Sequence, residues 1–140
     1  MIILDTNVIS EPMKASGNPA VQNWLDRQSA ETLYLTSTSL TELLVGIEVL
    51  QDGKRKAGLG AALSKLLPKL FGSRILPFDA NAAQAYAPLI ARAHVNGRSI
   101  SVGDGQIAAI AKVHGYIVAT RDTAPFIAAG VAVINPWDLR

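Results

Sequence analysis

Five short apolar runs alternate along this sequence with longer segments of helical periodicity. The runs cover residues 2–4, 33–35, 75–78, 116–119 and 131–134. Strands that are separated by helices form a parallel sheet, because a crossover between parallel strands needs a dozen or more residues, which a helix usually supplies. The pattern therefore predicts an α/β fold, a parallel sheet between two layers of helices. A chain of 140 residues suffices for one such core, so we expect a single domain over residues 1–140.

Capping residues predict where the intervening helices begin and end. A first helix is expected after Asp5-Thr6-Asn7, and Ser39 is expected to open a helix that Asp52-Gly53 ends. The other expected helices begin at Asn18-Pro19, lie within the basic segment 54–73, and run from Asp79 to Asn96-Gly97 and from Ser101 to His114-Gly115.

The composition excludes several classes of protein. The absence of cysteine excludes a disulfide scaffold and thiolate metal chemistry, and it suits a reducing compartment. No apolar run approaches the roughly 18 residues that a membrane span requires. The first residues lack the basic segment of a signal peptide. We therefore expect a cytoplasmic protein that does not associate with membranes.

Four acidic residues occupy positions where an α/β fold concentrates its functional groups. Asp5 directly follows the first apolar run, and Asp122 follows the fourth. The carboxyl ends of parallel strands meet at one edge of the sheet, so side chains that follow these strands lie near one another. Glu42 and Asp104 stand three residues after Ser39 and Ser101, in the first turns of two expected helices.

A capping role competes with a catalytic role for these acids. Ser-x-x-Glu is the capping-box pattern, in which the acid returns to the first amide of the helix. Taken singly, Glu42 and Asp104 fit this pattern better than they fit a catalytic site, and Asp5 and Asp122 also suit turns or N-caps. Asp104, however, heads the apolar stripe of its helix, which directs its carboxylate towards the sheet. A buried charge there requires a partner.

Carboxylates that converge favour a divalent cation. They raise one another's pKa values and destabilise the fold unless a cation lies among them. Oxygen ligands without His or Cys select Mg²⁺ or Mn²⁺. Such a site can activate a water for attack on a phosphodiester. With these four acids set aside, the 13 basic residues are in clear excess over the remaining acidic ones, which suits a polyanionic substrate.

Six short motifs resemble a known family in both order and spacing. They are ILDTNVISEP at 3–12, TEL at 41–43, ILPFD at 75–79, DGQIAA at 104–109, VATRD at 118–122 and NPW at 135–137. Over nearly the whole chain this arrangement resembles the PIN-domain ribonucleases of the VapC toxin class. The resemblance implies one PIN-like domain with a five-stranded parallel sheet, and RNA cleavage that depends on Mg²⁺ or Mn²⁺.

The resemblance also implies residue roles and partners. The acids of the family match Asp5, Glu42, Asp104 and Asp122 as catalytic residues and metal ligands, with Asp122 the most variable position. Thr6 and Thr120 resemble groups that orient these acids. Arg121, beside the site, is a candidate contact for RNA or for an acid of the partner. The implied partners are an antitoxin protein, a second copy of the chain in a homodimer, and operator DNA bound through the antitoxin complex.

Rival functions are weakened by particular residues. A haloacid-dehalogenase-like phosphatase needs a second acid where this chain has Asn7, and a nucleotide-binding module needs a glycine-rich loop after the first strand. A receiver-type signalling domain needs an adjacent acidic pair. The alternative that stays open is a PIN-fold interaction module that acts mainly within an antitoxin complex on operator DNA.

Overall fold

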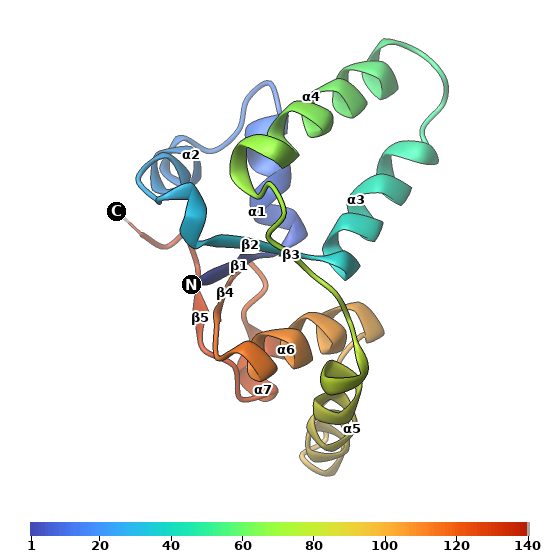
Figure 1. Ribbon diagram of the computed structural model, residues 1–140, viewed down its shortest axis with the longest axis vertical. Coiled ribbons are helices and arrows are strands. Elements are labelled where there is room, and N and C mark those ends of the chain that lie inside the picture. Colours follow the sequence, from blue (N-terminus) through green and yellow to red (C-terminus); the bar gives the residue numbers. More distant parts are fainter. Residues whose placement is uncertain (140) are drawn as a thin grey trace.

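A five-stranded parallel sheet lies at the centre of the structure, a computed structural model that describes residues 1–139 (Figure 1). The strands are β1 (Ile2–Leu4), β2 (Leu33–Thr36), β3 (Ile75–Leu76), β4 (Ile117–Ala119) and β5 (Val133–Ile134). They lie in the order β3-β2-β1-β4-β5, and every neighbouring pair is parallel. The predicted α/β class and five-stranded parallel sheet are confirmed.

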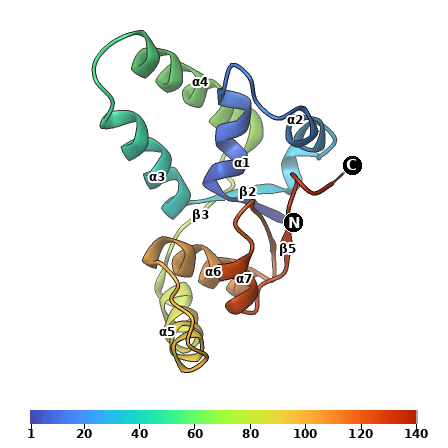
Figure 2. The ribbon, with the colours of Figure 1, turned by 180° about the vertical axis from the view of Figure 1, so that it is seen from behind.

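Two groups of helices cover the two faces of this sheet (Figures 1 and 2). One face carries α1 (Thr6–Ser10), α2 (Pro19–Asp26), α3 (Ser37–Glu48) and α4 (Lys54–Leu70), and the other carries α5 (Ala80–Val95), α6 (Val102–His114) and α7 (Ala124–Ala128). The 3-10 helices η1 (Glu11–Met13) and η2 (Ala30–Thr32) complete the elements of residues 1–139. None of the helices described there has the length and hydropathy that crossing a membrane requires.

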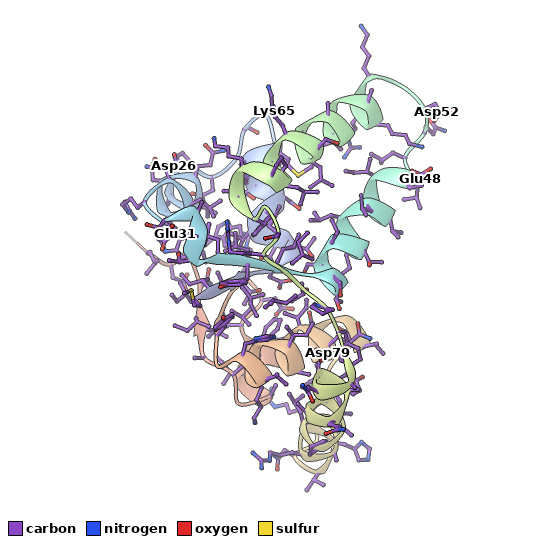
Figure 3. All side chains as sticks on the ribbon, viewed as in Figure 1. Asp26, Glu31, Glu48, Asp52, Lys65 and Asp79 are labelled. Atoms are coloured by element: carbon purple, nitrogen blue, oxygen red, sulfur yellow. The ribbon has the colours of Figure 1, made fainter. Side chains whose placement is uncertain are left out.

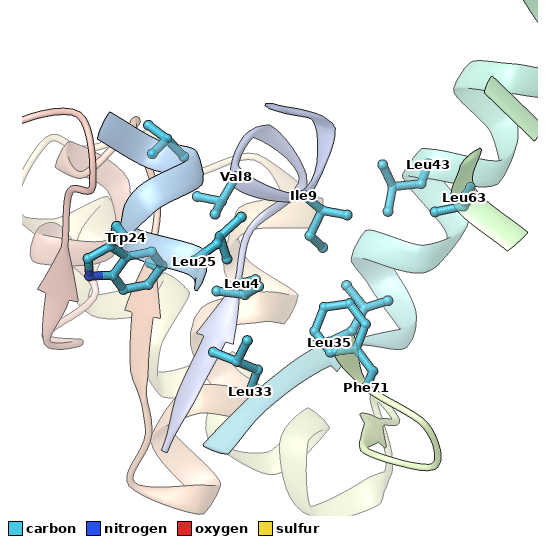
Figure 4. Packing of buried hydrophobic residues seen from close by; sticks show 12 residues of the cluster. Leu4, Val8, Ile9, Trp24, Leu25, Leu33, Leu35, Leu43, Leu63 and Phe71 are labelled. Atoms are coloured by element: carbon cyan, nitrogen blue, oxygen red, sulfur yellow. The ribbon is translucent and has the colours of Figure 1, made fainter. Parts of the chain in front are cut away.

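Alternate residues of the central strands supply two separate cores. Ile3 and Val118 pack against α5, α6 and α7, whereas Leu4 and Ala119 point to the opposite face and pack against α1 to α4. Figure 4 shows the second of these cores, in which Leu4 lies beside Val8 and Leu25, and Ile9 lies between these residues and Leu43 and Leu63 of α3 and α4. Burial of one such aliphatic side chain contributes about 1.5–3 kcal/mol. Hydrophobic burial on both faces therefore fixes β1 and β4 in register.

The strand order reverses between β1 and β4. The chain adds β2 and then β3 on one side of β1, and it returns to the other side of β1 for β4 and β5. Leu4 pairs with Ala119, and the Asp5 amide donates to the Ala119 carbonyl at 2.9 Å. The residues that follow β1 and β4 therefore leave the sheet side by side, at the position where open α/β sheets bind ligands.

Three strands are shorter than the sequence pattern predicts. β4 begins at Ile117, where residue 116 was expected, because the Tyr116 amide donates to the Ala111 carbonyl of α6. β3 ends at Leu76, where residues 75–78 were expected, because Pro77 has no amide hydrogen for the ladder. β5 begins at Val133, where residue 131 was expected, because the Val131 amide donates instead to the Phe126 carbonyl at the end of α7.

The start of α3 also differs from the prediction. Thr36, the last residue of β2, is the N-cap, and its hydroxyl accepts a hydrogen bond from the Ser39 amide at 3.0 Å. Ser39 lies inside the helix, so it does not open it. The helix ends at Glu48, several residues before the expected stop at Asp52-Gly53. The expected caps Asn18, Asp79 and Ser101 are confirmed for α2, α5 and α6.

Candidate active site

Asp5 is a buried carboxylate at the switch point of the sheet. It directly follows β1, and its side chain is the N-cap of α1. One carboxylate oxygen accepts the Thr6 amide at 2.8 Å, and the other accepts the Thr120 hydroxyl at 2.8 Å. With only 6% of its surface exposed, Asp5 is held in one orientation by the strand, the helix start and the neighbouring strand end.

Thr120 joins the residues that follow β1 to those that follow β4. It is fully buried, and its hydroxyl donates to Asp5 while it accepts the Asp122 amide at 3.0 Å. The Asn7 side chain approaches the same hydroxyl at 3.4 Å and accepts the Arg121 amide at 3.2 Å. Asn7 was missed as a site residue by the sequence interpretation, although the DTN motif is the pattern that could have revealed it.

Glu42 reaches the same edge of the sheet from α3. The Thr6 hydroxyl donates to its carboxylate at 2.9 Å, a contact between residues 36 positions apart. The capping-box interpretation of Glu42 is wrong, because Thr36 and not Ser39 caps this helix. Gly103 was also missed: a Cβ atom built there would lie 2.6 Å from a carboxylate oxygen of Glu42, so a side chain at this position would displace the acid from its present place.

Asp104 stands half-buried in the first turn of α6. The Ser101 hydroxyl accepts its backbone amide at 3.1 Å, so Ser101 caps the helix as expected. Burial raises the pKa of the Asp104 carboxyl, the Ser101 hydroxyl opposes this shift, and the charges of Asp122 and Glu42 add to it. The carboxylate therefore belongs to the acidic group while its own amide completes the helix cap.

The carboxylates interact unequally. Burial raises the pKa of Asp5, the hydrogen bonds from Thr120 and Thr6 lower it, and the negative charges of Asp104 and Glu42 raise it again. Asp122 is exposed and acts on Asp104. Asp5 and Asp104 thus form the inner, less exposed pair, and the exposed Glu42 and Asp122 stand at its outer side.

Basic side chains do not neutralise this group. Three ion pairs occur within residues 1–139: one joins Lys14 to Glu11, and two join Lys56 to Glu48 and Asp52. Glu48 and Asp52 lie at the far end of α3 and the loop after it, away from the sheet (Figure 3). The negative charge at the switch point therefore has no cationic side chain as its partner in the described part of the chain.

The four acids do not all converge on one point. Within residues 1–139, no three acidic or histidine side chains are arranged to hold one metal ion together. The roles of the four acids as metal ligands therefore stay a prediction. The donor set still suits a hard cation, because Mg²⁺ takes one or two carboxylates directly and keeps several waters. Asp5 and Asp104 are the buried and half-buried donors that could hold it.

Comparison with known proteins identifies the family. The PIN domain model matches residues 2–131. This chain belongs to the PIN domain family. It is 50% identical to VapC ribonuclease Y4jK of Sinorhizobium fredii over 99% of both chains, and 47% identical to Toxin FitB of Neisseria gonorrhoeae over 98% of this chain and 99% of FitB. A solved structure of FitAB bound to an IR36 DNA fragment matches with a TM-score of 0.93 at 46% identity, covering 100% of this chain and 98% of the other.

These matches confirm the resemblance that the six motifs indicated. They extend over almost the entire PIN domain, so the relatives share its elements and not one motif alone.

Arg121 lies at the outer rim of the site in this PIN domain. Its guanidinium carbon is 5.2 Å from the centre of a Trp137 ring, a cation–π distance. Its positive charge also contributes to the lowered pKa of Glu11, for which the backbone hydrogen bond from Asn18 is the main cause. The side chain is exposed above the loop that carries Thr120 and Asp122.

We expect Asp104→Asn to leave the metal-free PIN domain equally stable or more stable. A raised pKa means that the folded state binds more protons than the unfolded state above pH 3.8, so the free energy of unfolding falls as the pH rises through this window. The free energy of unfolding stays lowered at neutral pH, where Asp104 is charged, and a neutral asparagine abolishes this destabilisation. The helix dipole opposes the gain by about 0.5 kcal/mol. Thermal unfolding in EDTA from pH 4 to pH 8 measures the effect.

A lower melting temperature for Asp104→Asn, by several degrees at neutral pH, would show that the carboxylate mainly caps α6. Asp79→Asn is the matched control, because Asp79 caps α5 in the ordinary way and its variant retains an amide oxygen for the cap.

Proposed function

We propose that this PIN domain is a metal-dependent endoribonuclease, the toxin component of a type II toxin–antitoxin system that acts in the cytoplasm. The observation that carries the proposal is the buried Asp5 carboxylate at the switch point. The negative charges of Asp104 and Glu42 act on it, and it has no basic partner among residues 1–139. The 50% identity of this chain to a VapC ribonuclease over nearly the full length supports the same activity.

In this proposal the residues of the chain divide the work between binding and orientation. Asp5 and Asp104 bind Mg²⁺ or Mn²⁺ directly, and Glu42 and Asp122 bind it directly or through water. A bound cation would supply an activated water and neutralise charge on the phosphodiester. Thr120 and Thr6 keep the carboxylates of Asp5 and Glu42 in their orientations by the hydrogen bonds that they donate.

The proposed partners are RNA, an antitoxin protein and a second copy of the chain. The solved FitAB complex on a DNA fragment supports an antitoxin partner and binding of operator DNA through the complex. Arg121, exposed at the rim, is proposed as a contact for RNA phosphate or for an antitoxin acid. For the homodimer, exposed apolar side chains such as Val95 and Val102 offer surface for contact.

Cleavage of RNA by partner-free protein tests the proposal. We expect cleavage with Mg²⁺ or Mn²⁺, none in EDTA, and recovery when Mn²⁺ is added back. Folded protein that cuts no RNA, or cuts equally well in EDTA, would contradict the nuclease assignment. Binding of antitoxin and DNA without any cleavage would instead favour the interaction-module alternative, which does not require the acids.

We expect Gly103→Ala to lower RNA cleavage about tenfold without destabilising the protein. The added methyl group displaces the Glu42 carboxylate, whose exposed and flexible side chain can move at little cost. Alanine is also a better helix former than glycine, so the backbone of α6 is not weakened by the change. Initial cleavage rates and thermal unfolding, measured beside Gly60→Ala, separate the two effects, because a Cβ atom at Gly60 meets nothing within 4 Å. Equal rates for the two variants would show that the position of Glu42 is unimportant.

A further inference from the structure

We infer that a pocket beside Asp104 and Asp122 binds one nucleotide of the RNA, next to the phosphodiester that is cut, with Arg98 as the contact for its phosphate. This rests on the proposed nuclease function. The pocket has a volume of about 330 Å³ and lies between the loop before α6 and the start of α7. Figure 2 shows α6 and α7 side by side on one face of the sheet. The volume is at the lower end of the range for small-molecule sites, which suits a single nucleotide.

The walls of this pocket combine the groups that a nucleotide requires. Asp104 and Asp122 form the side next to the proposed metal site, so a nucleotide in the pocket is continuous with the reacting phosphate. Ile100, Pro125 and Ala128 supply apolar surface for a base or ribose.

Arg98 supplies a positive charge in the lining of the same pocket. It is exposed, and none of the three ion pairs within residues 1–139 includes it, although two carboxylates share the pocket. A guanidinium group matches the geometry of a phosphate, to which it can donate two parallel hydrogen bonds. Arg98 is therefore available to neutralise a phosphate that the nearby acids would otherwise repel.

The position of the acids between two hollows supports a strand that crosses the site. On the other side, Thr6 and Glu42 border a second hollow of about 640 Å³, and Lys54 and Arg55 also line it. The carboxylates thus lie between a pocket that contains Arg98 and a hollow that contains Lys54 and Arg55. A single strand that places one phosphate at the acids would extend in both directions towards basic side chains.

Arg98→Gln tests the phosphate contact, with Arg92→Gln as the matched control. Arg92 is likewise an exposed arginine near the end of α5, but it lines a different cavity with Lys112. The substrate is a short single-stranded RNA that the wild type cuts at one mapped position. We expect kcat/KM to fall about tenfold for Arg98→Gln and to change less than about twofold for Arg92→Gln. Equal values for the two variants would overturn the inference.

Neutral phosphates identify which charge Arg98 contacts. In a series of substrates, each phosphate near the cut is replaced in turn by an uncharged methylphosphonate. At one position beside the cut, we expect the replacement to lower kcat/KM of the wild type about tenfold and to leave kcat/KM of Arg98→Gln unchanged. Losses that multiply at every position would show that Arg98 acts through the general field and not through a bound phosphate.

Ala124→Trp tests the pocket itself. Ala124 is an exposed first residue of α7 that lines the pocket, so a large side chain there fills the space while all four acids stay in place. We expect cleavage to fall at least tenfold while the affinity for Mn²⁺, measured by calorimetry, stays that of the wild type. Undiminished cleavage would contradict the inference alone, whereas a wild type that cuts no RNA would contradict the proposed function as well.

Discussion

Asp5→Asn is expected to abolish RNA cleavage, with a loss of about 1,000-fold or more, while the protein stays folded. The variant removes the buried charge that would bind the cation, and loss even of a group that merely orients a metal ligand costs 10–100-fold. The asparagine oxygen can still accept the Thr6 amide, so α1 keeps its N-cap. Because burial raises the pKa of Asp5, removing the charge favours the folded state in EDTA. Loss of the hydrogen bond from the Thr120 hydroxyl opposes this gain by about 1–3 kcal/mol, so we expect only a small net change in the free energy of unfolding. Initial cleavage rates measure the loss of activity, Mn²⁺ titration measures the loss of cation binding, and thermal unfolding measures the stability of the variant.

Asp122→Asn is the matched control for this prediction. Asp122 is an exposed acid at the outer side of the group, and we expect its variant to lose tenfold activity or less. If Asp122→Asn were as inactive as Asp5→Asn, the division into inner and outer acids would be wrong. Activity of Asp5→Asn within tenfold of the wild type would exclude Asp5 as a metal ligand.

The fold could be predicted because apolar runs and helical stripes each carry their own periodicity. The parallel sheet and its helical layers follow from that alternation. The boundaries depended on choices between similar residues. Thr36, Ser37, Thr38 and Ser39 can all cap a helix, and the end of β2 decides in favour of Thr36. Likewise, Val131 reads as a strand residue, but its amide is bound by the end of α7.

The acids could be predicted from their places after strands and in first helical turns, but the contacts between them could not. The Thr6–Glu42 bond joins residues 36 positions apart, and the Asn7–Thr120 contact joins residues 113 apart. No local spacing encodes such contacts, because they depend on how α3 and the loop after β4 meet the end of β1. The contact that a side chain at position 103 would make has the same origin, since Glu42 comes from another helix.

Thr120→Val is expected to have the second-largest effect, because it damages both stability and activity. Valine has the shape of threonine, but it cannot donate to Asp5 or accept the amide of Asp122. Each unsatisfied group in a buried site costs about 1–3 kcal/mol, so we expect the free energy of unfolding to fall by about 2–4 kcal/mol. Loss of the hydrogen bond also raises the pKa of Asp5, which weakens cation binding about 10–100-fold. Chemical denaturation and Mn²⁺ titration measure the two losses.

Thr120→Ser separates the hydroxyl from the methyl group. Serine keeps the donor to Asp5 and the acceptor for the Asp122 amide, and it removes one buried methyl group at a cost of about 1 kcal/mol. We therefore expect Mn²⁺ affinity and cleavage rate per folded molecule to stay near those of the wild type. If both variants lost cation affinity equally, packing around β4 and not the hydrogen bond would orient Asp5. A loss in the valine variant alone would assign that orientation to the single hydroxyl that joins the ends of β1 and β4.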